Sequence, residues 1–283
     1  MQDFDLKPYL SQIKLPLPQS KKGENGRVLV IGGSKLFHAA SFWSASMASR
    51  IVDMVHFSSP LMENNDLMRV KAKEKFWDGI VVPYESIDHY IYEDDCILIG
   101  PGMERGQTTK LIVNAFLSKY PHKKWLVDGG ALQEVDPTLL TSSMIITPNA
   151  KEYALLQTHL PNYSITQLPC TILAKGETDT ITPSGISHLE PACAGRSRIY
   201  LSGGSPNMTR GGTGDVLAGL VAGLAAKSDS FASCVVASYL NKASSEQLGL
   251  IFTPNDLITQ NALTLNSLLL PHLSQPPNLP LQS

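Results

Sequence analysis

Seven short apolar runs, separated by segments of helix length, constrain the fold of this chain more than any other feature. Each run is almost continuously apolar instead of alternating, which is typical of strands that are covered on both faces. The segments between them, such as 39–50 and 107–120, are long enough for crossover helices. This order predicts an α/β fold with a doubly wound, mostly parallel sheet and helices on both faces. The predicted strands are 27–33, 51–57, 79–82, 96–100, 124–128, 143–147 and 170–174.

The rest of the chain has a different pattern. Residues 178–202 form shorter pieces rich in Gly, Pro and Ser, which predict antiparallel hairpins at one edge of the sheet. After Gly211 the pattern predicts three helices, at 213–226, 230–248 and 253–270. We find no internal repeat and no linker, so we predict a single domain over 1–283. It carries an N-terminal surface arm at 1–25 and a frayed tail at 271–283, where four prolines occur.

Composition excludes several classes of function. The 23 basic and 25 acidic residues nearly cancel, which argues against nucleic acids and acidic membranes as partners. The longest run of apolar residues and Gly, 216–226, is far shorter than the roughly 20 residues that cross a bilayer. The four cysteines are far apart and have apolar neighbours, so we expect buried thiols in a reducing compartment. With no secretory signal at the N-terminus, these features predict a cytoplasmic protein.

Five of the apolar runs are followed by residues suited to binding. In a parallel sheet the carboxyl ends of the strands meet at one edge, where functional residues gather. Each segment alone is compatible with an ordinary turn. Five of them at one edge indicate a binding site. The segments are GGS (32–34), GPGM (100–103), DGGAL (128–132), TPNAKE (147–152) and KGETD (175–179).

The segment TRGGTGD (209–215) carries the sharpest chemical signal. Its glycines let the backbone approach a ligand closely, and the helix that begins near Thr213 directs its unpaired N–H groups at the same place. Such a site suits an anion, in particular a phosphoryl group in transfer. Asp215 in the first turn is either a favourable helix N-terminal charge or a general base for an attacking hydroxyl.

Two further motifs fit nucleotide chemistry. Asn149 and Glu152 share one face at a strand-to-helix junction and either hold a water-bound Mg²⁺ or form a helix cap. Lys175 and Gly176 offer a positive charge and a close approach of the backbone, which suits a nucleotide phosphate. The alternative is that Lys175 is a solvent-exposed lysine in a turn, with no role in binding.

Together these motifs resemble a known family. TRGGTGD and the pair Asn149 and Glu152 are similar to the anion-hole and magnesium motifs of the ribokinase superfamily. The ordered set GRVLVIGGS, IGPGM, VDGGAL, ITPNxxE, KGETD and GGTGDVLAGLVAGL resembles the ADP/ATP-dependent NAD(P)H-hydrate dehydratases, over about residues 22–270. The resemblance implies a ribokinase-like three-layer sandwich and a repair reaction. In that reaction ADP or ATP drives the dehydration of hydrated NADH or NADPH.

The resemblance also implies roles for individual residues. Asp215 would be the base that lets the C6 hydroxyl attack the terminal phosphoryl group, and the amides of Gly212, Thr213 and Gly214 would stabilise the developing charge. Phosphate would then be eliminated. Mg²⁺ would be held through water by Asn149 and Glu152, and members of the family often form tetramers. The nucleotide would contact Lys175, Gly176, Glu177, Thr178, Asp179 and Gly214. The hydrated nicotinamide would face Ala40, Gly102, Asn149 and Asp215.

The chain departs from the family pattern at a few positions, and two alternatives to the dehydratase stay open. Ala39 stands where Gly is usual, and Ser205 stands where Asn is common. A ribokinase-like kinase of a vitamin precursor or a sugar alcohol would use the same Asp215 and the same anion hole. A nucleotide-binding module without turnover is the third hypothesis, and the departures at Ala39 and Ser205 are its only support.

Overall fold

A nine-stranded sheet forms the centre of the molecule. The computed structural model describes residues 4–74, 79–160, 162–185 and 197–273. The strand order is β3-β2-β1-β4-β5-β6-β7-β8-β9; the first seven strands are parallel, and β8 and β9 are antiparallel to their neighbours. The strands are β1 (Arg27–Ile31), β2 (Met54–Ser58), β3 (Gly79–Val81), β4 (Cys96–Ile99), β5 (Trp125–Val127), β6 (Ile145–Ile146), β7 (Thr171–Ala174), β8 (Thr178–Thr182) and β9 (Ile199–Ser202). The predicted α/β class, the parallel sheet and the antiparallel edge are confirmed. Residues 186–196 of the predicted hairpin region lie outside the described residues.

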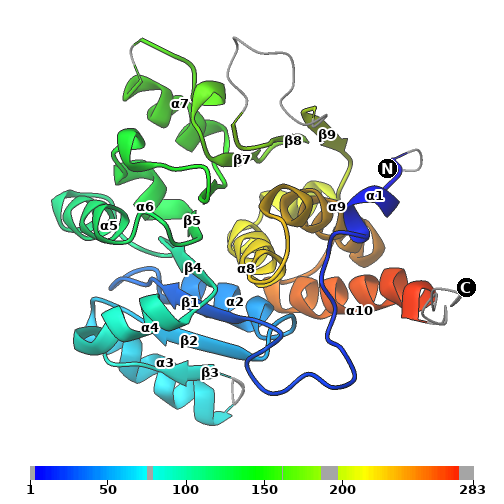
Figure 1. Cartoon of the computed structure of the whole chain (residues 1–283), viewed down its shortest axis with the longest axis horizontal. Coiled ribbons are helices and arrows are strands. Elements are labelled where there is room, and N and C mark those ends of the chain that lie inside the picture. Colours follow the sequence, from blue (N-terminus) through cyan, green and yellow to red (C-terminus); the bar gives the residue numbers. More distant parts are fainter. Residues whose placement is uncertain (1–3, 75–78, 161, 186–196, 274–283) are drawn as a thin grey trace, which may run out of the picture.

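Helices cover both faces of the sheet, with α5, α6 and α7 on one side and α8, α9 and α10 on the other (Figure 1). Successive residues of β1 show this: Val28 and Val30 belong to the core on the α8 side, whereas Leu29 and Ile31 belong to the core on the α5 side. The near-continuous apolar runs therefore fill two cores. The helices are α1 (Lys7–Leu10), α2 (His38–Ala48), α3 (Met62–Glu74), α4 (Ile87–Glu93), α5 (Gln107–Lys119), α6 (Gly129–Glu134), α7 (Ala150–Thr158), α8 (Thr213–Ala225), α9 (Ser230–Leu248) and α10 (Pro254–Leu273).

Helix α8 is the most buried helix of its layer, and it positions the functional residues at its start. Small residues let α2 approach it closely: a Cβ at Gly219 would collide with the backbone of Ser44, and one at Gly223 would collide with Ile51. The Ser44 hydroxyl donates a hydrogen bond of 2.8 Å to the backbone carbonyl of Asp215. The first turn of α8 is thus held by α2 as well as by its own helix.

The structure of the two chain ends differs from the predicted surface arm at 1–25 and from the predicted frayed tail at 271–283. Leu6, Leu10 and Ile13 are buried in the core on the α8 side, and the ring of Tyr9 meets that of Phe231 edge-on. The N-terminal segment therefore packs against the core of its own domain instead of lying free on the surface. Helix α10 extends to Leu273 and includes the first three residues of the predicted tail; residues 274–283 lie outside the described residues. Within the described part of the chain, no helix combines the length and the apolar character needed to cross a membrane.

Candidate functional site

The site lies where the strand order reverses, between β1 and β4. Such a switch point opens a crevice at the carboxyl ends of the strands. The loops after these two strands fit tightly: Gly33 N–H donates to the Pro101 carbonyl at 2.8 Å, and a Cβ at Gly102 would collide with the Phe37 carbonyl oxygen. Gly102 also has φ +72°, a conformation that side chains disfavour. This glycine is therefore required by the close approach of the two loops.

The glycine loop before α8 is shaped as an anion site. Gly212 precedes the helix with φ +101°, which turns the chain into the first helical residue, Thr213. The Thr213 hydroxyl donates to the carbonyls of Met208 and Arg210 at 2.7 and 2.9 Å, which fixes the loop. At Gly214 there is open space, because the nearest atom to an added Cβ would be Lys175 Nζ at 3.5 Å. Helix N-terminal amides and a lysine ammonium therefore face the same space.

Asp215 has an unusual affinity for protons. Burial raises the pKa of its carboxyl to about 7, and the charges of Asp128 and Glu152 act in the same direction while Lys175 opposes them. A carboxyl with a pKa near neutrality is a far stronger base than an ordinary aspartate. This property suits the predicted general base more than a plain helix N-terminal charge, which would keep a low pKa.

Asp128, which is buried, and Lys175, which is partly buried, form an ion pair beside this carboxyl. Lys175 Nζ lies 2.8 Å from Asp128 Oδ1, and the same oxygen accepts a 2.7 Å hydrogen bond from the Thr147 hydroxyl. Burial alone would lower the pKa of Lys175, but the carboxylates of Asp128 and Glu152 outweigh it and raise that pKa. Lys175 is therefore a permanent positive charge.

Asn149 and Glu152 form a complete capping box at the start of α7. Asn149 Oδ1 accepts from the amides of Lys151 and Glu152, and Glu152 Oε2 accepts from the Asn149 amide at 2.9 Å. The Asn149 oxygen is thereby fully used. Each Glu152 oxygen accepts one bond, the second from Gln133, so Glu152 keeps room for a metal-bound water. Magnesium binding through water stays a prediction.

The KGETD loop is held by a lysine that the sequence did not single out. Lys242, in the middle of α9, donates to the carbonyls of Gly176, Glu177 and Gly203 at 3.0 to 3.2 Å. Asp179 turns inward, accepting from the Gly176 amide and the Ser238 hydroxyl. Thr178 pairs with Ser202 on the exposed edge of the sheet and does not line the cavity beside Lys175.

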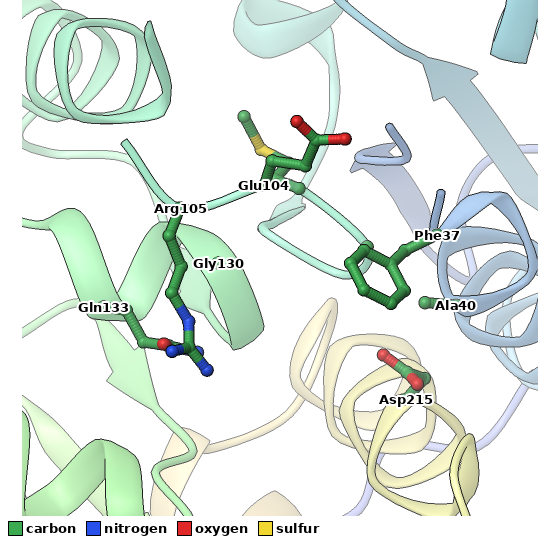
Figure 2. A pocket seen from close by; sticks show the side chains of 9 residues that line it. Phe37, Ala40, Glu104, Arg105, Gly130, Gln133 and Asp215 are labelled. Carbon is green, nitrogen blue, oxygen red and sulfur yellow. The ribbon is translucent and has the colours of Figure 1, made fainter. Parts of the chain in front are cut away.

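Two cavities meet at Asp215, which alone among the described residues lines both. The first, the Arg105 cavity, has a volume of about 520 Å³; Asp215, Phe37 and Ala40 lie on one side of it, and Arg105 and Gln133 lie on the other (Figure 2). The second, the Lys175 cavity, has a volume of about 810 Å³ and contains the glycine loop and the capping box. The predicted site residues in the Lys175 cavity are Asn149, Glu152, Lys175, Gly176, Glu177, Asp179, Gly212, Thr213, Gly214 and Asp215; those in the Arg105 cavity are Ala40, Gly102 and Asp215.

The structure thus separates one predicted group. The family resemblance implies that Asn149, Ala40 and Gly102 face the hydrated nicotinamide together. In the structure Asn149 lies in the Lys175 cavity, apart from Ala40 and Gly102 in the Arg105 cavity. Sequence reasoning also gave no role to Asp128, although the DGGAL segment after β5 signalled it. Arg105 lies two positions after the GPGM segment and belongs to none of the predicted motifs. Lys242 has no sequence signal, since its contacts come from tertiary structure.

Comparison with known proteins identifies similar sequences. Residues 28–264 match the family model described as NAD(P)H-hydrate dehydratase. The ADP-dependent (S)-NAD(P)H-hydrate dehydratase of Nitrosopumilus maritimus is 30% identical over 270 residues, covering 86% of this chain and 89% of that protein. The bifunctional NAD(P)H-hydrate repair enzyme of Methanocaldococcus jannaschii is 31% identical over 251 residues, covering 84% of this chain. The chain spans about half of that bifunctional relative, 48% of its length.

Solved structures share the fold. The ADP/ATP-dependent NAD(P)H-hydrate dehydratase of Bacillus subtilis, co-crystallised with ATP and Mg²⁺, has a TM-score of 0.71 at 18% identity, covering 93% of this chain and 97% of that one. A ribokinase-like superfamily protein of Enterococcus faecalis has a TM-score of 0.74 at 21% identity, covering 93% and 95%. These likenesses confirm the predicted ribokinase-like architecture.

Proposed function

Because the chain belongs to the NAD(P)H-hydrate dehydratase family, we propose that it restores hydrated NADH or NADPH to the intact cofactor with ADP or ATP as co-substrate. One observation carries the proposal: Asp215 lines both cavities, so one carboxylate reaches a nucleotide on one side and a second substrate on the other. A base that activates a hydroxyl for attack on a phosphoryl group must lie between the two. The enzyme is then a lyase of cofactor repair.

The proposed reaction has two steps. Asp215 accepts the proton of the C6 hydroxyl, whose oxygen attacks the terminal phosphoryl group of the nucleotide and displaces AMP or ADP. The backbone amides of Gly212, just before α8, and of Thr213 and Gly214 in its first turn stabilise the charge on the transferred group. The lone pair of the ring nitrogen then expels the phosphate from C6, and loss of a proton from the neighbouring carbon restores the dihydronicotinamide.

The nucleotide side is assigned to the Lys175 cavity. The ammonium of Lys175 lies beside Gly214, where it offsets phosphate charge, and the backbone of the 175–179 loop is held for binding by Lys242. Glu152 would hold Mg²⁺ through bound water, and Asn149 would support it by fixing Glu152 in the cap. When bound, the ion would neutralise charge on the phosphoryl oxygens.

The test is restoration of reduced-nicotinamide absorbance from hydrated NADH in the presence of nucleotide and Mg²⁺, with inorganic phosphate measured in parallel. We expect a nucleotide-dependent rise that Asp215→Asn lowers by about 10²–10⁴-fold, the usual contribution of a general base. Nucleotide binding without any rise or phosphate release would refute the dehydratase proposal. A variant that keeps more than half of the activity would refute the role of Asp215.

Two properties accompany this proposal. We place the enzyme in the cytoplasm, because Cys96, Cys170 and Cys234 are buried free thiols, and burial raises the pKa of Cys96 and of Cys170 to about 12.

We also propose a homotetramer, as the family resemblance implies. Light scattering tests it, and a clean species of 30.7 kDa would refute it.

A further inference from the structure

The Arg105 cavity contains one positive charge that the proposed chemistry does not use. Of the nine residues in the described part of the chain that line this cavity, Glu104 and Asp215 are acidic and Arg105 alone is basic. The Arg105 side chain extends from the loop after β4 to beside Gln133, across the cavity from Asp215 (Figure 2). Among the described residues, no ion pair or hydrogen bond engages its guanidinium. The cavity therefore presents a free anion receptor opposite the general base.

The backbone that carries Arg105 is held on both sides. The Thr109 hydroxyl donates to the Glu104 carbonyl at 2.5 Å, and the Gly106 amide donates to Glu134 Oε1 at 2.9 Å. Thr109 is buried, and Glu134 belongs to α6. Arg105 is therefore rooted at a fixed point, and only its side chain has to be ordered by a ligand. The Glu104 carboxylate points away from the guanidinium (Figure 2).

The two sides of the cavity match the two ends of one kind of molecule. Asp215 is the base for a ring hydroxyl, so the nicotinamide ring must lie at the side formed by Asp215, Phe37 and Ala40. A dinucleotide carries its pyrophosphate one ribose away from that ring, and its adenosine 2′-phosphate, where present, a further ribose away. A guanidinium binds phosphate oxygens in bidentate fashion. The group within reach from the opposite side of the same cavity is the pyrophosphate.

We propose that Arg105 is a specificity-determining residue that binds the pyrophosphate of the hydrated dinucleotide while its ring lies at Asp215. This inference rests on the proposed function. It predicts that the cavity selects a dinucleotide over a bare hydrated ring or riboside. It also predicts that NADH and NADPH forms are bound through the same contact.

The experiment compares the wild type with Arg105→Gln and Arg105→Lys on three substrates: hydrated NADH, hydrated NADPH and hydrated dihydronicotinamide riboside, which has no phosphate. For Arg105→Gln we expect KM to rise about 10- to 100-fold for both dinucleotides, the effect of losing a hydrogen bond to a charged group, with kcat within about twofold. KM for the riboside should not change. Arg105→Lys should recover part of the loss, because it keeps the charge without the planar fork.

Arg50→Gln is the matched control, since Arg50 is also an exposed arginine but lies outside both cavities. An unchanged KM for hydrated NADH in Arg105→Gln overturns the inference, as does an equal loss on the riboside. A loss confined to hydrated NADPH also overturns it, because the contact would then be to the 2′-phosphate. A wild type that turns over none of the three substrates refutes the proposed function instead.

Discussion

Lys175 Nζ lies 2.8 Å from Asp128 Oδ1 and 3.5 Å from the position that a Cβ on Gly214 would occupy. Asp128 is almost fully buried and is itself held by Thr147, so the pair has little freedom. The carboxylate thereby directs the ammonium at the start of α8, where the transferred phosphoryl group is expected. Burial raises the pKa of Asp215, and the same carboxylate raises it further, so Asp128 influences both the position of the cation and the strength of the base.

The first prediction concerns the pH dependence of kcat/KM. A general base must be ionised, so with a pKa of about 7 for Asp215 we expect activity to rise with pH and level off above about pH 7. Asp128→Asn removes a negative charge that raises this pKa and leaves the opposing Lys175 in place. The acid limb of the profile should therefore move to lower pH.

The matched control for this shift is Asp66→Asn, an exposed carboxyl on α3 paired with Arg69. In this control the acid limb of the pH profile of kcat/KM should coincide with that of the wild type. If Asp128→Asn lowers the rate at every pH without moving the limb, the electrostatic link between Asp128 and Asp215 is wrong.

The second prediction concerns stability. The pKa of Asp215 is raised to about 7 in the folded protein from an ordinary value of 3.8. Below about pH 4 the carboxyl is protonated in both states and has no effect. Between about pH 4 and 7 only the unfolded state ionises, so the wild type loses stability as pH rises. Asp215→Asn cannot ionise, and its free energy of unfolding should exceed that of the wild type by about 4 kcal/mol at pH 8, since each pKa unit corresponds to about 1.4 kcal/mol. Thermal unfolding at pH 5 and pH 8 measures this, and an equal Tm difference at both pH values would contradict it.

The parallel strands could be predicted because each is apolar on both faces, a pattern that few other structures produce. Helices α8 and α9 were also predicted closely, since they are long and begin near clear signals. Helix α6 was not, because it begins with Gly129 and Gly130, which favour turns in isolation. There the glycine at 130 is needed for packing, as a Cβ would collide with the Met103 backbone. Tertiary contact has overridden local preference.

The sequence predicted which segments form the candidate site, but not which side chains contact one another within it. The strand-end rule brought Asn149 and Lys175 to one edge, and both line the Lys175 cavity. It gave no means of pairing Lys175 with Asp128, which is 47 positions away in the sequence. It also gave no sign that Asp215 separates two cavities, since cavity walls depend on side chains such as Phe37 and Arg105 that carry no motif.

The third prediction contrasts two glycines of one loop. Gly212→Ala should destabilise the protein, because its φ is +101° and the new methyl would lie 2.5 Å from the Trp43 ring and 2.6 Å from Pro254. Gly214→Ala should fold at least as stably, since alanine favours the helix by up to about 1 kcal/mol and the space is open. Its methyl would occupy the anion site, so nucleotide affinity should fall at least about tenfold. Thermal unfolding and nucleotide titration separate the two effects, and tight nucleotide binding by Gly214→Ala would place the phosphate elsewhere.

The last prediction separates the two roles of Glu152. Glutamine at this position still completes a capping box, and it removes a buried carboxyl whose pKa is raised by burial and by Asp128. Glu152→Gln should therefore change the free energy of unfolding by less than about 0.5 kcal/mol, or stabilise the protein slightly. Asn149→Ala breaks the cap and should cost about 1 kcal/mol. If Glu152 also holds the water shell of Mg²⁺, the Mg²⁺ concentration for half-maximal activity should rise about tenfold in Glu152→Gln, because an amide binds the hard cation more weakly than a carboxylate. An unchanged Mg²⁺ requirement in this stable variant would leave Asn149 and Glu152 with the cap alone.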